Sequence, residues 1–148
     1  LPVFLIFIGN LAGGVVLRSG VPLARLLTIV LLVQSAVWLY IPYASAGPLG
    51  AAAMLAFGLA AGMTPTCLYA APATILGTSR AGSGAFGLLH MGRSLGVLTG
   101  PLLMAQAFVW LGSWSATAPI FGVIGLLTAA IAAWLGVELK RMGPPLRA

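Results

Sequence analysis

The stretch from Gly82 to Trp110 reads GSGAFGLLHMGRSLGVLTGPLLMAQAFVW and decides the fold. It is long and apolar enough to cross a membrane, yet it contains His90 and Arg93, which lipid does not stabilise without a partner. Three glycines recur in it at a four-residue spacing: Gly92, Gly96 and Gly100. This spacing places them on one stripe of a helix, where another backbone can approach closely. The stretch therefore predicts a membrane helix packed inside a bundle.

Arg93 and His90 are the chemically informative residues of this stretch. At about 100° per residue, Arg93 lies only about 60° from the middle of the glycine stripe, and His90 lies further round the helix and marks the edge of that face. A charge near the bilayer centre costs about 3 kcal/mol on insertion scales, so an arginine there indicates a functional position. The alternative is that Arg93 lies near the charged end of its helix and snorkels, or caps carbonyls of a neighbouring helix.

Composition restricts the class of protein. Of the 148 residues, 61% are hydrophobic and 5% are charged, whereas soluble domains carry about 25% charged residues. A spanning helix needs about 20 apolar residues, so the chain has room for about five spans and for no soluble domain. We expect an all-α, polytopic transmembrane helix bundle. Because the chain begins inside an apolar run without a basic leader, we interpret it as part of a longer protein.

The expected spans are joined by short turns rich in glycine and proline. They cover residues 1–17, 23–43, 48–76, 83–111 and 118–137. The third span differs from the others, because Pro65 and Pro72 interrupt it and Gly58 and Gly62 form a close-packing pair. Hydroxyl groups nearby can satisfy the carbonyls that the prolines free, or they bond only to their own helix. These groups belong to Thr64, Thr66, Tyr69 and Thr74.

Basic residues fall on one side of this segmentation. Those outside the spans or at their ends are Arg18, Arg25, Arg80, Lys140, Arg141 and Arg147. The opposite connections, residues 44–48 and 112–115, carry no charge and are flanked by the Trp and Tyr residues that favour membrane interfaces. Since cytoplasmic connections carry the excess of Lys and Arg, we expect a multi-pass protein of the plasma or inner membrane with a cytoplasmic C-terminus.

Two segments resemble motifs of the major facilitator superfamily (MFS) of secondary transporters. Residues 13–20, GGVVLRSG, resemble the family's signature at a cytoplasmic turn through Arg18 and Gly20, although Leu17 stands where an acidic residue is usual. Residues 96–101, GVLTGP, resemble its glycine-proline motif and include Pro101. The resemblance covers nearly the whole chain and implies the last five membrane helices, eight to twelve, of an MFS-type fold.

The resemblance also implies where a solute binds. In such transporters the tenth helix lines the central cavity, the eighth and eleventh pack between the two halves, and the solute site lies near the midplane. The candidate substrate-binding residues are therefore Thr64, Thr66, Tyr69, His90 and Arg93. The candidates for helix packing and gating are Gly58, Gly62, Gly92, Gly96, Gly100, Pro101, Arg18 and Gly20.

The same residues disfavour other chemistry. Glu138 is the one carboxylate and Cys67 the one cysteine, so neither a paired-carboxylate enzyme nor a multi-cysteine metal site can be assembled. The net charge of +6 is scattered, which does not predict nucleic-acid binding. We expect a secondary active transporter of a small solute, with an anion favoured, that has no cofactor and acts with an N-terminal half in the lipid bilayer. The alternative is a channel or structural membrane subunit.

Overall fold

The computed structural model describes residues 2–44, 47–77 and 81–142, which are almost entirely helical. The helices are α1 (Pro2–Arg18), α2 (Leu23–Tyr40), α3 (Pro48–Leu76), α4 (Ser83–Leu111) and α5 (Trp114–Met142), and a 3-10 turn, η1 (Ile41–Tyr43), extends α2. The described residues contain no strand, so the predicted all-α class is confirmed. The predicted positions of Arg80 and Arg147 lie outside the described residues.

Four of the helices are long and apolar enough to cross a membrane: α2 with η1, α3, α4 and α5. The apolar part of α1, Phe4–Arg18, is shorter than those four. At a rise of about 1.5 Å per residue, the 29-residue helices α3, α4 and α5 each extend over about 43 Å, more than the hydrocarbon core of a bilayer. Length and composition thus define a multi-pass helical membrane protein.

Helix α5 (Trp114–Met142) contains the whole expected last span of residues 118–137 and extends beyond it at both ends. One detail of the predicted third span is wrong. Helix α3 is continuous through Pro65 and Pro72, although the two prolines are expected to interrupt it. Each proline removes only one backbone hydrogen bond, and the bonds on either side hold the helix together.

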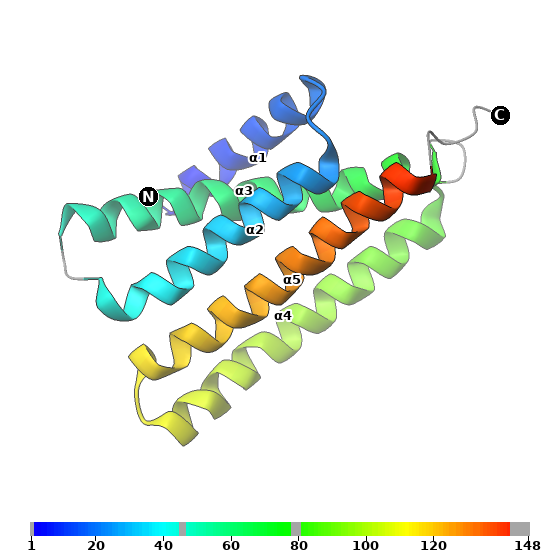
Figure 1. The fold of residues 1–148 in the computed structure, drawn as a ribbon. Coiled ribbons are helices and arrows are strands. Elements are labelled where there is room, and N and C mark those ends of the chain that lie inside the picture. The colour runs from blue at the N-terminus through cyan, green and yellow to red at the C-terminus, as the bar shows by residue number, and fades with distance from the viewer. Residues whose placement is uncertain (1, 45–46, 78–80, 143–148) are drawn as a thin grey trace.

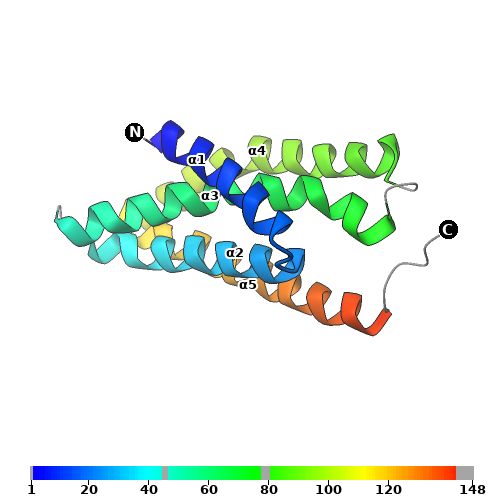
Figure 2. The same cartoon turned by 90° about the horizontal axis from the view of Figure 1, so that it is seen from above.

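The helices do not lie in space in their order along the chain. Figure 1 shows α2 between α3 and α5, with α1 against α3, while Figure 2 shows α4 and α5 separating from each other away from the turn that joins them. The most extensive contacts join α2 to α5, α1 to α3 and α2 to α3, while α4 touches α3 and α5 only lightly. Figure 2 shows α1 crossing over α3 on the side away from α5. Helix α4 is therefore the least firmly held part of the bundle.

Glycines bring the backbones of α1 and α3 together. A Cβ atom at Gly62 would overlap the carbonyl oxygen of Ile6, and one at Gly9 would overlap that of Leu59. A Cβ atom at Gly58 would lie 3.0 Å from the Cβ of Leu5. Close approach of this kind is the usual way in which membrane helices associate, because lipid removes the hydrophobic drive between them.

Helices α2 and α5 meet through a second set of small residues. The Ser35 side chain is fully buried, and its hydroxyl donates a hydrogen bond to the Leu31 carbonyl oxygen at 2.7 Å. A Cβ atom at Gly125 would overlap that hydroxyl, and one at Gly122 would lie 2.6 Å from the Cγ of Leu39. The largest fully buried side chains of the described residues are only Thr117, Cys67 and Ser35. The most deeply buried side chains are thus small, and Leu26, Leu27 and Val30 of α2 pack in the core cluster that contains Cys67.

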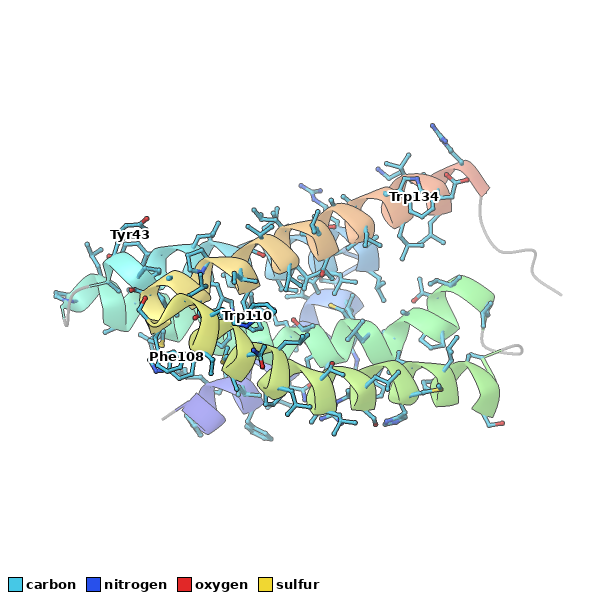
Figure 3. The ribbon with its side chains drawn as sticks, turned by 90° about the horizontal axis from the view of Figure 1, so that it is seen from below. Tyr43, Phe108, Trp110 and Trp134 are labelled. Carbon is cyan, nitrogen blue, oxygen red and sulfur yellow. The ribbon has the colours of Figure 1, made fainter. Side chains whose placement is uncertain are left out.

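The two ends of the bundle differ in character. Arg18 ends α1, Arg25 lies in the first turn of α2, and Lys140 and Arg141 lie in the last turn of α5, so these four cations share one end. Figure 3 shows Tyr43, Phe108 and Trp110 at the opposite end and Trp134 toward the basic end. At that opposite end the rings of Phe108 and Trp114 stack with their centroids 4.5 Å apart.

The contact between α1 and α3 predicts a large difference between two glycine substitutions. Gly62→Leu should destabilise the protein by about 3 kcal/mol, because the side chain would displace the α1 backbone. Gly14→Leu is the matched control, since a Cβ atom there meets nothing within 4 Å. Thermal unfolding of both variants in detergent measures the effect, and equal stabilities would contradict the described contact.

Candidate functional site

A row of polar side chains crosses α1, α3 and α4. Thr66 on α3 donates a hydrogen bond to the Asn10 carbonyl oxygen at 3.1 Å and also contacts the Asn10 side-chain oxygen Oδ1. One turn further along α3, the Tyr69 ring lies against the His90 ring of α4, with centroids 5.4 Å apart and planes at 49°. The polar row therefore consists of Asn10, Thr66, Tyr69 and His90.

Arg93 lies three residues beyond His90, which is close to one helical turn along α4. Arg93 is exposed. It is about 6 Å from the middle of α4, since four residues separate it from the midpoint of Ser83–Leu111. That depth falls inside the hydrocarbon layer if α4 is centred in a bilayer. Among the described residues the one acidic group, Glu138, pairs instead with Arg141 at 3.5 Å.

Thr64 lies apart from the other four predicted binding residues. Its hydroxyl accepts a hydrogen bond from Gln34 Nε2 of α2 at 2.7 Å and donates one to the Ala60 carbonyl oxygen at 3.0 Å. Thr64 thus belongs to the contact between α2 and α3. The two-residue separation from Thr66 corresponds to about 200° around a helix, which turns the two hydroxyls to nearly opposite faces.

The predicted packing residues fall into two groups. Gly58 and Gly62 lie in the contact of α3 with α1, where a Cβ atom at either position would meet α1. By contrast, Gly92, Gly96 and Gly100 have no atom within 4 Å of the position that a Cβ would take, and no described residue of α4 is buried. The glycine stripe of α4 therefore faces outward from the described bundle.

The remaining predicted residues occupy helix ends or exposed positions. Arg18 is the last residue of α1, and Gly20 follows in the turn with φ +90°, a backbone conformation that favours glycine. Pro101 is exposed within α4, and the nearby Thr99 hydroxyl bonds to the Leu95 carbonyl oxygen at 2.8 Å. Arg18 and Gly20 thus lie at the basic end, away from the polar row.

Two polar residues outside the predicted set are connected to it in the structure. Asn10 bonds to Thr66, and Gln34 bonds to Thr64. The available signal was an amide side chain inside an otherwise apolar run, because such groups in a membrane helix seek a partner on a neighbouring helix. The spacing of the run does not show which helix supplies that partner.

The arrangement offers side chains that can bind a polar solute. It offers hydroxyl, phenol, imidazole and guanidinium groups, and no cluster of three or more metal-ligating side chains occurs among the described residues. Donors and a cation at membrane depth recognise polar or anionic groups. Comparison of the chain with protein-family models, curated proteins and solved structures gives no match.

The bond between α2 and α3 predicts a measurable coupling. Gln34→Leu and Thr64→Val should each destabilise the protein, and the double variant should show a coupling of about 0.6 to 1.7 kcal/mol, typical of polar contacts between membrane helices. Thr74→Val is the control, because among the described residues the Thr74 hydroxyl bonds only to Ala70 of its own helix. Additive effects in an unfolding titration would show that the bond contributes nothing.

Proposed function

We propose that this chain forms the last five membrane helices of an MFS-type secondary active transporter, which moves a small anionic solute by alternating access. The observation that carries the proposal is the polar row from Asn10 to His90, which joins three helices of the bundle. Polar side chains at membrane depth are expensive, so their grouping across helices favours a solute or ion pathway.

The loose packing of α4 also supports the proposal. This helix carries His90 and Arg93, has no buried residue among those described, and turns its glycine stripe away from the bundle. A stripe of glycines suits a close helix partner more than lipid, because its missing side chains leave the backbone accessible. In the proposed transporter that partner is the N-terminal half of the protein.

An anionic solute fits the charge of the region. Arg93 has no carboxylate partner among the described residues, and a guanidinium group at membrane depth requires compensation. Its planar fork binds carboxylate or phosphate groups through two parallel hydrogen bonds. His90, about one helical turn from Arg93 on the same helix, adds a second polar side chain.

Arg93→Lys provides the test of this function. In the complete transporter, uptake of a panel of small organic carboxylates and phosphate esters should saturate for at least one solute. Arg93→Lys should weaken the affinity for that solute about tenfold or more, because an ammonium group does not reproduce the bidentate geometry. Arg18→Lys, at the exposed end of α1, should leave the affinity unchanged. Unchanged affinity in Arg93→Lys would remove Arg93 from the site, and a flux that does not saturate would favour a channel.

The proposed orientation places the basic end in the cytoplasm. Two serines that are exposed at opposite ends, Ser19 and Ser115, allow a test in a Cys67→Ala background. A cysteine at position 115 should react with a membrane-impermeant maleimide from outside intact cells. A cysteine at position 19 should react only after the cells are opened, and the reverse pattern would contradict the orientation.

A further inference from the structure

A cavity of about 690 Å³ opens at the basic end of the bundle, between α2 and α5. Its volume lies within the range of about 300 to 1,000 Å³ that is typical of small-molecule sites. The first turn of α2 and the last turns of α5 form its walls, and Thr74 near the end of α3 completes it. The cavity is separate from the polar row of α1, α3 and α4.

Two cations from different helices line this cavity, Arg25 of α2 and Lys140 of α5. No acidic residue lines it, and the described ion pair of this region joins Glu138 to Arg141, which is not among the lining residues. The positive end of the α2 dipole adds to the same field. The cavity therefore attracts an anion that can lie between the two helices.

The hydroxyl groups in the cavity do not supply the recognition. The Thr28 hydroxyl donates to the Ala24 carbonyl oxygen at 2.7 Å, and the Thr74 hydroxyl donates to the Ala70 carbonyl oxygen at 2.9 Å. Each hydroxyl has one proton, so neither can donate to a ligand at the same time. Binding of an anion thus depends on Arg25 and Lys140.

The wall of the cavity becomes apolar toward the middle of the membrane. Ile29 lies about 6 Å deeper than Arg25 along α2, and Ala133 lies about 10 Å deeper than Lys140 along α5. Gly136 and Val137 lie between them on the α5 side. A charged rim above an apolar wall matches a phospholipid, whose phosphate is joined to acyl chains, better than it matches a free phosphate ion.

We propose that this cavity is a binding site for an anionic phospholipid, with the headgroup phosphate between Arg25 and Lys140 and an acyl chain along Ile29, Ala133 and Val137. Basic pockets between membrane helices recognise lipid phosphates because they combine charge with contact to the acyl region. The site is independent of the proposed solute pathway, since it uses none of the residues of the polar row or Arg93.

The fluorescence of Trp134 can be used to detect lipid at this site. It follows the lining residue Ala133, and Figure 3 shows it far from Tyr43 and Trp110 at the other end of the bundle. The 148-residue chain with Trp38, Trp110 and Trp114 replaced by Phe retains Trp134 as its one tryptophan. This variant is reconstituted in phosphatidylcholine vesicles that contain a bromine-labelled lipid, which quenches tryptophan fluorescence on contact. Half-maximal quenching of Trp134 should need a much lower mole fraction of bromine-labelled phosphatidylglycerol than of bromine-labelled phosphatidylcholine. The two cations, Arg25 and Lys140, should give phosphatidylglycerol a preference of about thirtyfold over phosphatidylcholine.

The double variant Arg25→Gln/Lys140→Gln should abolish this preference. The control Arg18→Gln/Arg141→Gln removes the same net charge from the same end but outside the cavity, and it should keep the preference. Equal quenching by the two lipids, or equal loss in both double variants, would overturn the proposal. Loss of the preference on adding inorganic phosphate at constant ionic strength would assign the cavity to a soluble anion and would overturn it as well.

Discussion

The bundle depends on close contact between helix backbones. In a bilayer, moving an apolar side chain from lipid to a helix contact gains little free energy, because the lipid acyl chains are as apolar as the side chains of the neighbouring helix. Association then depends on van der Waals contact and on a few polar bonds, and both improve when side chains are small. Gly9 and Gly62 bring α1 and α3 together in this way, and Gly125 does so for α5 and the buried Ser35 of α2.

The sequence is sufficient to predict the helices, because apolar runs of this length have no other stable form in a membrane. It is not sufficient to predict how two prolines are accommodated: α3 continues through Pro65 and Pro72, since the local bonds around them persist. The expected last span ends at residue 137, and the helix that contains it is longer. Helix α5 continues past Glu138 to Met142, because charged side chains at a membrane boundary do not end a helix.

The candidate site is predicted in part. Tyr69 and His90 lie together because α3 and α4 touch at that level, while Thr64 and Thr66 separate because two residues turn a helix by about 200°. The helical period by itself is enough to assign these two threonines to different faces of α3. The partners Asn10 and Gln34 depend on tertiary structure, since each lies on a helix distant in sequence from the hydroxyl it meets.

The contrast between the two glycine stripes bears on how a transport cycle would use this bundle. Gly58 and Gly62 hold α3 against α1 through close backbone contact. The stripe that includes Gly96 gives α4 no such contact among the described residues. A rocking motion needs one rigid group of helices and one element free to change partners. Helix α4 meets the second requirement, and it also carries the cation of the proposed solute site. Movement of α4 would therefore change the surroundings of Arg93 directly, which is the coupling between conformation and binding that alternating access requires.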